Sequence, residues 1–313
     1  MVKQYQRAHE ASVWFQREGT GRTVMSGEDA LDLLQRLSTN GLLHLEAGKT
    51  TTTGLCNRNG RLLDLLVVWH LGEQLLLIGA EGQGENTRAI LHRSISWKEQ
   101  VSVLDGDKGL QHITLVGPDA VEVARSFVGG LAESTCLEQN SAWFAFGPQL
   151  CAEQSVNIAC PTASLPDLIK SLTAAGAVEG GQQLWQVLRV EAGLPAGGTE
   201  ISGAHIPLEL DLWSSVDFNK GCFVGQEVLA RMESRGKLAR TIVGIRSDEQ
   251  FKTGVKLEGS DKIRGLVTSV ASSPTFGCIG LALLRPSSVQ AGTTVSVQGG
   301  GTAEVVELPF QSL

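Results

Sequence analysis

The sequence has few cysteines, and none of them occurs in a spacing typical of a metal site. The six are Cys56, Cys136, Cys151, Cys160, Cys222 and Cys278, with no C-x-x-C among them. This low density and irregular spacing argue against a zinc module and against a disulfide scaffold, and they favour a reducing compartment. We therefore expect a cytoplasmic protein with no metal site of its own.

Aromatic residues, a basic excess and long apolar runs are also scarce. Aromatics make up 5% of the chain, and 26 basic against 33 acidic residues give a net charge of −7. This balance does not indicate a dedicated nucleic-acid or membrane-binding protein. The segment 1–22 has no apolar core of the signal-peptide type, and no apolar run reaches membrane-spanning length. We expect neither nucleic acid nor a membrane as a partner.

The 313 residues carry two kinds of pattern in succession. Such a length is too great for one typical core, so two or three domains are expected. Before Gly236, strand-like and helical runs alternate, and a strand followed by Gly-x-Asp-Ala and a helix occurs twice, near residues 25 and 116. This repetition suggests two related α+β lobes. After Gly236, short β-type runs alternate with turn residues and predict a small β-barrel.

An isolated carboxylate lies in a predicted hairpin. Residues 55–69 are typical of strand, turn and strand, because Asn59-Gly60 is a strong hairpin signal. Asp64 interrupts the apolar run of the second strand, where a buried carboxylate is costly unless it has a partner. Asp64 is therefore either an edge-strand residue that faces water or a residue that faces a ligand.

A second carboxylate lies at the end of the helix predicted from Gln183, in the run Arg-Val-Glu-Ala-Gly-Leu-Pro. Glu191 is either an exposed acid at the helix end or a group that binds a ligand. One carboxylate can accept two adjacent N–H donors of a heterocycle, which fixes its orientation. Arg189 either pairs with Glu191 or reaches the anionic tail of a ligand, and a surface ion pair is a further alternative.

A loop bracketed by two glycines carries Cys222. Gly221 and Gly225 suggest a tight turn, and the pattern becomes helical after Gly225. Lys220 and the helix N-terminus would both favour a thiolate, so Cys222 is a candidate reactive thiol. The alternative is a buried structural cysteine, because free cysteine is among the most buried residue types.

These segments together resemble one protein family. Residues 220–227, Lys-Gly-Cys-Phe-Val-Gly-Gln-Glu, are similar to the signature of the YgfZ-type folate-binding proteins. These are relatives of the glycine-cleavage T-protein, an aminomethyltransferase, and are associated with iron–sulfur protein maturation. The run 189–195 resembles the family's Arg-x-Glu-Ala-Gly-x-Pro element. The predicted hairpin resembles the T-protein's Gly-Gly-x-x-Asp-Asp segment, but only Asp64 is present and Leu65 takes the second place.

The resemblance covers residues 23–308 and implies a fold. It implies a clover-leaf of two α+β lobes and a C-terminal β-barrel around a central channel that holds folate. The folate-binding region would occupy residues 1–235, with one discontinuous lobe at about 1–48 plus 105–235 and the other at about 49–104. The barrel would occupy residues 236–313.

The resemblance also implies a cofactor, tetrahydrofolate or a derivative, and a set of site residues. Asp64 and Glu191 would face the pterin, and Asp64 and Cys222 are the candidate catalytic groups. Three further residues would bind the cofactor or support its channel: Lys220, Gln226 and Arg231. Arg231 would steady its helix or meet the glutamate tail of the folate.

Three functions follow from these features. The first is a tetrahydrofolate-binding accessory protein that helps to assemble or repair iron–sulfur clusters, with client or assembly proteins as partners. The second is a folate-dependent aminomethyltransferase, against which the single aspartate and the cysteine loop count. The third is a non-catalytic scaffold, against which the Arg-x-Glu-Ala-Gly-x-Pro run counts. We favour an accessory factor over a turnover enzyme.

Overall fold

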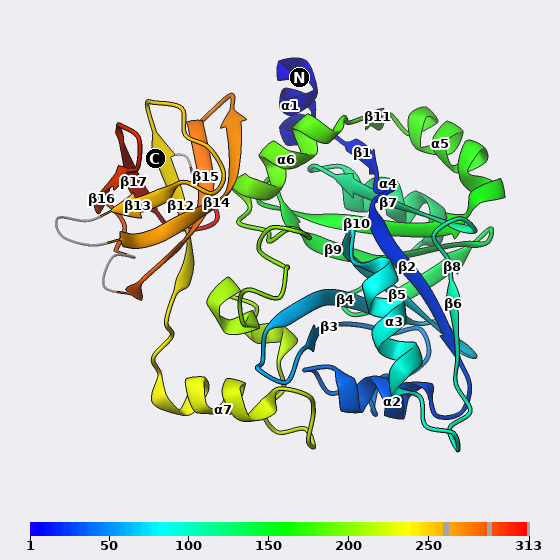
Figure 1. Ribbon diagram of the computed structural model, residues 1–313. Coiled ribbons are helices and arrows are strands. Elements are labelled where there is room, and N and C mark those ends of the chain that lie inside the picture. The colour runs from blue at the N-terminus through cyan, green and yellow to red at the C-terminus, as the bar shows by residue number, and fades with distance from the viewer. Residues whose placement is uncertain (259–262, 287–289, 312–313) are drawn as a thin grey trace.

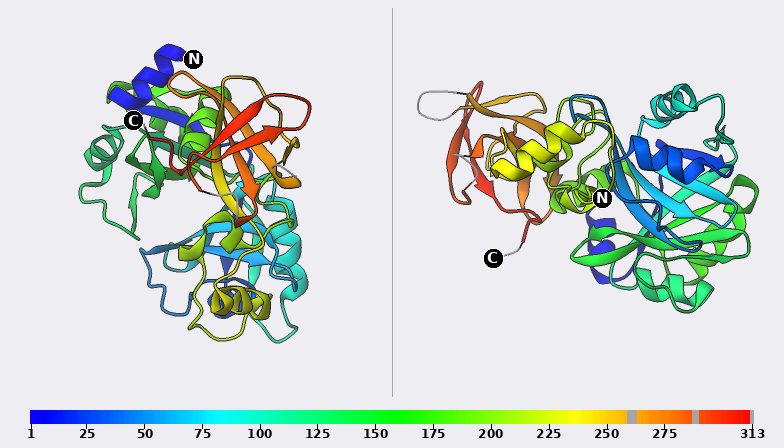
Figure 2. Two further views of the ribbon diagram at one scale, coloured as in Figure 1. Left: turned by 90° about the vertical axis from the view of Figure 1, so that its left-hand side faces the viewer. Right: turned by 90° about the horizontal axis from the view of Figure 1, so that it is seen from below.

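Three parts make up the molecule in the computed structural model, which describes residues 1–258, 263–286 and 290–311 (Figure 1). Two parts are α+β lobes built on separate sheets, and the third is a closed six-stranded barrel. The right-hand view of Figure 2 shows the barrel standing to one side of the lobes. The predicted α+β fold with a C-terminal β-barrel is therefore confirmed.

The first lobe is built on a six-stranded sheet with the strand order β11-β1-β7-β10-β9-β8. Its strands are β1 (Val13–Gln16), β7 (Leu110–Val116), β8 (Cys136–Gln139), β9 (Ala142–Leu150), β10 (Glu153–Pro161) and β11 (Val178–Glu179). Its helices are α1 (Val2–Glu10), α4 (Ala120–Val128), α5 (Leu165–Ala174) and α6 (Gln182–Glu191), with a short 3-10 helix at Thr162–Ser164. The second predicted strand–Gly-x-Asp-Ala–helix unit, near residue 116, is thus β7 followed by α4.

The second lobe is built on a five-stranded sheet with the order β3-β4-β5-β2-β6. Its strands are β2 (Thr20–Ser26), β3 (Thr50–Cys56), β4 (Leu62–His70), β5 (Gln74–Glu81) and β6 (Ser102–Asp105), and its helices are α2 (Ala30–Leu37) and α3 (Gly84–Ser94). The predicted Asn59-Gly60 turn joins β3 to β4, with Gly60 at φ +68°. The apolar spacing of α2 places Leu33, Leu34 and Leu37 in the lobe's core.

The boundary between the lobes differs from the expected one. We predicted residues 1–48 to belong with 105–235, but β2 pairs with β5 and β6, whereas β1 pairs with β7 and β11. The chain therefore passes from one lobe to the other between β1 and β2, at residues 17–19. The sequence predicted the strand near residue 24 but not its partners, because strand pairing is decided by contacts far along the chain.

The barrel has the strand order β12-β15-β14-β13-β16-β17 and closes on itself. Its strands are β12 (Thr241–Ser247), β13 (Lys256–Glu258), β14 (Ile263–Ser273), β15 (Gly277–Leu284), β16 (Thr294–Val297) and β17 (Thr302–Val306). Leu188 of α6 belongs to the same apolar cluster as Ile279 and Leu281 of β15, so the barrel packs on α6. After β17, the backbone N–H of Phe310 donates to the carbonyl of Glu191 at 2.8 Å.

The segment between α6 and the barrel runs along the second lobe before it reaches the barrel. It contains two 3-10 helices, Pro207–Leu210 and Trp213–Ser215, and helix α7 (Gln226–Arg235). Among the helices of the described residues, none is both long and apolar enough to cross a bilayer.

Candidate ligand-binding site

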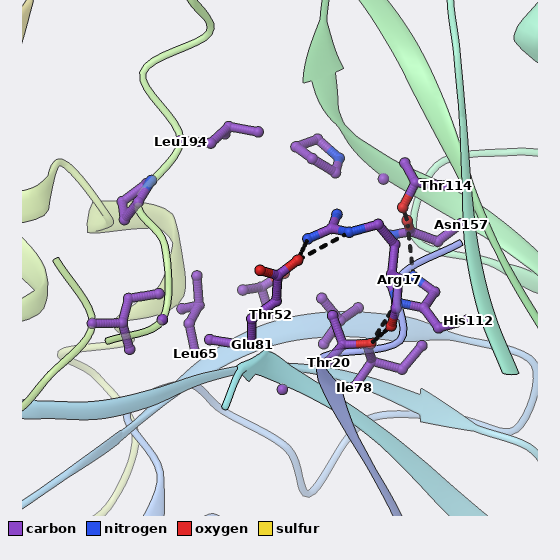
Figure 3. Close-up of a pocket in the computed structure, with 18 of the residues that line it drawn as sticks. Arg17, Thr20, Thr52, Leu65, Ile78, Glu81, His112, Thr114, Asn157 and Leu194 are labelled. Carbon is purple, nitrogen blue, oxygen red and sulfur yellow. Dashed lines mark hydrogen bonds and ion pairs between the residues drawn. The ribbon is translucent and has the colours of Figure 1, made fainter. Parts of the chain in front are cut away.

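A cavity of about 510 Å³ lies between the two sheets and the segment that follows α6. Strands β3, β4 and β5 of the second lobe form one side of it, and β7, β9 and β10 of the first lobe form another. Leu194, labelled in Figure 3, and Leu212 line a further side of it. Pockets of 300–1,000 Å³ with apolar walls and a few placed polar groups are typical of small-molecule sites.

An ion pair lies in the wall of this cavity, where the connection into β2 runs beside the end of β5. Arg17, in the connection between β1 and β2, donates from Nε and Nη2 to Oε1 of Glu81 at 3.2 and 2.5 Å (Figure 3). The guanidinium also lies over the ring of Trp185 at 3.5 Å from its centroid. Burial lowers the pKa of Arg17 and the pair with Glu81 opposes that shift, but an arginine stays charged at neutral pH. The stacking and the pairing together fix the plane of the guanidinium.

A row of buried polar side chains forms the wall beside Arg17. Nδ1 of His112 lies 3.0 Å from Oγ1 of Thr20, and Nε2 lies 3.2 Å from Oδ1 of Asn157. Thr114 donates to the same Oδ1 at 2.9 Å. Burial, helped by the charge of Arg17, lowers the pKa of His112 to about 3. The imidazole is therefore neutral at physiological pH, and it orients Asn157 instead of titrating.

Asp64 lies next to the cavity but not in its wall. Along β4, Leu65 and Val67 line the cavity, so Asp64 points to the opposite face of the sheet. There its carboxylate accepts hydrogen bonds from the backbone N–H of Leu65 and Ala80, both at 2.8 Å, and from Thr87 Oγ1 at 2.6 Å. Burial raises the pKa of Asp64 from 3.8 to about 6, and these hydrogen bonds oppose the rise.

Neither alternative that the sequence offered for Asp64 describes this position. The edge-strand alternative is wrong because the side chain is fully buried. The expectation that it faces the cavity is also not met, since Leu65 and Gly79 line the cavity in its place.

Glu191, at the end of α6, lies between α1 and the barrel and is not one of the residues that line the cavity. Its Oε1 accepts a hydrogen bond from the hydroxyl of Tyr5 at 3.0 Å, and that hydroxyl lies 3.0 Å from Oγ1 of Thr275 in the barrel. His9 Nε2 is 4.0 Å from Oε2. Burial raises the pKa of Glu191, and hydrogen bonds from Ser273 and Tyr5 oppose the rise. The carboxylate thus joins α1, α6 and the barrel.

Arg189, two residues earlier, does line the cavity. It does not pair with Glu191. Instead, its guanidinium lies 3.8 Å from the carboxylate of buried Glu200 and donates to Ser269 at 2.9 Å. It also donates to Gln186 Oε1 and to the carbonyl of Leu194. The ion pair is therefore buried, and its donors hold the segment after α6 against the barrel.

Lys220 and Cys222 are neighbours in sequence but have separate surroundings. Nζ of Lys220 donates to the carbonyls of Gln35, Ser38 and Asn40, each at 2.7 Å. An ammonium has three donors, so all of them are committed to the end of α2. Burial lowers the pKa of Lys220 to about 8. Cys222 is exposed to solvent, so the buried-cysteine alternative is wrong.

The remaining predicted residues lie on α7. Gln226 is the first residue of the helix, which follows Gly225 at φ +85°. Arg231 pairs with Glu227 at 2.7 Å on the exposed surface, as expected for an i,i+4 pair. The cavity's lining contains neither residue, nor Lys220 nor Cys222. The structure therefore does not bring the predicted site residues together in one cavity.

Sequence reasoning missed the charged and aromatic residues of the cavity, Arg17, Glu81 and Trp185. None of them belongs to a motif that we had singled out. The usable signals were weak: Glu81 ends an apolar strand, and His112 stands in a run that is otherwise apolar. Their meaning depends on which strands face each other.

The fold defines a two-lobed protein with an attached barrel and a cavity between its lobes. A model of the GCVT N-terminal domain matches residues 2–220, and a model of the glycine cleavage T-protein C-terminal barrel domain matches residues 240–311. The chain therefore belongs to the glycine-cleavage T-protein family. The family part of the resemblance is confirmed, whereas its YgfZ-type branch stays a prediction.

Proteins named aminomethyltransferase are among its relatives. That of Symbiobacterium thermophilum is 28% identical over 337 residues, covering 99% of this chain and 89% of the relative. That of Halalkalibacterium halodurans is 28% identical over 319 residues, covering 93% and 84%. The crystal structure of glycine cleavage system aminomethyltransferase T from Bartonella henselae has a TM-score of 0.88 at 21% identity, covering 99% and 89%. The structural likeness shows a shared fold.

Proposed function

We propose that this protein binds a reduced folate, tetrahydrofolate or a derivative, in the cavity between its lobes. The observation that carries this proposal is the combination of apolar walls, such as Leu65 and Val67, with polar groups that keep unused hydrogen-bonding capacity. Within the described part of the chain, no hydrogen bond uses Oε2 of Glu81 or Nδ2 of Asn157. A pterin has flat apolar faces and an edge of donors and acceptors, so the cavity suits it.

Folate would supply one-carbon chemistry, and the residues of this chain would hold and orient it. Apolar side chains of β4 and β5 would contact the faces of the heterocycle. Arg17, Glu81 and Asn157 would meet its edges. Membership of the glycine-cleavage T-protein family supports this choice of ligand over other small heterocycles.

Aminomethyl transfer is the role that the names of the relatives support. In that role Asp64 would act on the folate as an acid or base, and a pKa near 6 suits such a group. The position of Asp64 counts against it, because the carboxylate lies on the far side of β4 and all of its hydrogen-bond partners are protein groups.

An accessory role in iron–sulfur cluster assembly or repair is the second candidate, and exposed Cys222 favours it. A thiol on the surface can reach a partner protein, whereas a thiol inside the cavity could not. Among the described residues, no three side chains of His, Cys, Asp or Glu are grouped so that they could hold a metal ion. Any cluster contact through Cys222 would therefore be shared with a client or assembly protein.

Calorimetric titration with tetrahydrofolate tests the common part of the proposal. We expect saturable binding with a dissociation constant in the micromolar range or lower. Absence of binding would refute it and leave the scaffold function. As a control, the variant Glu99→Gln, which alters a surface Arg–Glu pair outside the cavity, should bind tetrahydrofolate with the same affinity as the wild-type protein.

Two further assays separate the roles. Glycine-cleavage turnover with a lipoylated carrier protein, lost in Asp64→Asn, would support aminomethyl transfer. Complementation of an iron–sulfur maturation defect, lost in Cys222→Ser with an unchanged melting temperature, would support the accessory role. Turnover that survives Asp64→Asn, or complementation that survives Cys222→Ser, would contradict the residue assigned to each role.

A further inference from the structure

The carboxylate in the cavity wall comes from the end of β5, not from the motif at the end of α6. Glu81 lines the cavity with about 30% of its side chain exposed, whereas Glu191 is buried against Tyr5 and the barrel. Arg17 occupies only Oε1 of Glu81, so Oε2 keeps both of its lone pairs. A ligand in the cavity can therefore meet a carboxylate without displacing any contact within the protein.

A donor group lies beside this free acceptor. Nε and Nη2 of Arg17 point to Glu81, and among the described residues no hydrogen bond uses Nη1. Trp185 holds the guanidinium from one face at 3.5 Å, and this stacking limits its rotation. The pair thus offers a free acceptor, Oε2 of Glu81, and a free donor, Nη1 of Arg17, in the wall of one cavity.

From this arrangement we propose that the Arg17–Glu81 pair selects a heterocycle with a 2-amino-4-oxo edge. Such an edge presents an amino group, a ring N–H and a carbonyl in a row. Glu81 accepts from the amino group and the ring N–H, and Arg17 donates to the carbonyl. Trp185 acts as a positioning residue, because it holds the donor in place and does not itself meet this edge.

The pair also explains what the cavity would reject. A 2,4-diamino heterocycle places a second amino group where the carbonyl would be, so a donor would face the guanidinium. A buried donor that meets another donor leaves both unsatisfied, which costs binding free energy. The inference rests on the proposed folate binding and adds the residues that provide its selectivity.

The test compares tetrahydrofolate with its 4-amino-4-deoxy analogue, which differs at that one position. We expect the wild-type protein to prefer the 4-oxo ligand. Glu81→Gln should weaken tetrahydrofolate binding by roughly 10- to 100-fold, the range for loss of a hydrogen bond to a charged group. Arg17→Met should reduce the preference for the 4-oxo ligand, and Trp185→Phe should reduce it less.

Controls separate selectivity from folding. Glu81→Gln keeps Oε1 available to Arg17 and should fold normally, which thermal denaturation checks. Glu99→Gln, in a surface Arg–Glu pair, should leave both affinities unchanged. If the wild-type protein binds tetrahydrofolate, Glu81→Gln does not weaken it and Glu191→Gln abolishes it, this inference is wrong and folate binding stands. If the wild-type protein binds neither ligand, the proposed function fails and the inference fails with it.

Discussion

Oδ2 of Asp64 lies 2.5 Å from the position that a β-carbon on Gly79 would occupy. Gly79 lines the cavity on one face of β5, and Asp64 lies against its other face. Only the backbone of a glycine therefore separates the buried carboxylate from the cavity. This close contact explains why position 79 has no side chain, since a β-carbon there would occupy the space that the buried carboxylate of Asp64 fills.

Gly79→Ala should destabilise the protein by about 1–3 kcal/mol, because the new methyl group would collide with Asp64 and with Leu66. Urea denaturation measures the change in the free energy of unfolding. Gly109→Ala is the matched control, since a β-carbon there meets no atom within 4 Å. Equal effects of the two substitutions would show that the close approach at position 79 has no energetic consequence.

Asp64→Asn should make the protein less sensitive to pH. The pKa of Asp64 is raised from 3.8 to about 6 in the folded protein, so between these values the folded state binds the proton more tightly than the unfolded state. Stability from this group is therefore present below pH 3.8 and is lost as the pH rises towards 6. The loss amounts to about 3 kcal/mol at neutral pH.

The free energy of unfolding of the wild-type protein and of Asp64→Asn should be compared at pH 4, 5, 6 and 7. The difference should shift in favour of the asparagine variant as the pH rises. Asparagine keeps an acceptor for the backbone N–H groups of Leu65 and Ala80, so folding should be retained. A difference that stays constant from pH 4 to 7 would contradict the raised pKa.

Lys220→Met should destabilise the protein by roughly 2–4 kcal/mol, because it leaves buried backbone carbonyls at the end of α2 without donors. Chemical denaturation is the measurement, and Lys3→Met, on the exposed surface, is the control.

The same variant, Lys220→Met, should alkylate at Cys222 within about twofold of the wild-type rate, because the ammonium of Lys220 is committed to the carbonyls at the end of α2. A large fall in the alkylation rate would contradict this prediction and would show that Lys220 activates the thiol of Cys222.

Cys222 should react first with a thiol reagent under native conditions, because it alone among the six cysteines is exposed. Burial raises the pKa of Cys56 and Cys151 to about 12 and of Cys136 and Cys160 to about 11, so little thiolate forms there. Peptide mapping by mass spectrometry after a short exposure to iodoacetamide identifies the labelled site. Equal labelling of Cys151, or labelling that persists in Cys222→Ser, would contradict this order.

The sequence by itself determined the elements whose causes are local. Asn59-Gly60 predicted the β3–β4 turn because only a few residue types adopt its backbone geometry. The Gly-x-Asp-Ala opening after residue 26 predicted α2, and Leu33, Leu34 and Leu37 reach the core because a helix brings residues three and four apart onto one face. Short β-type runs after Gly236 predicted the barrel, and the motifs around Glu191 and Cys222 indicated the family.

Only the tertiary structure decided which side chains meet. Arg17 and Glu81 are 64 positions apart and form a pair because β2, which follows Arg17, pairs with β5, so that Thr20 lies opposite Glu81. Asp64 and Leu65 are adjacent, but alternate residues of a strand face opposite sides, and the helices that cover one side hide Asp64. Lys220 is next to the Cys222 loop in sequence, yet it binds carbonyls about 180 positions away. Side-chain direction depends on packing between distant segments, which no local pattern in the sequence contains.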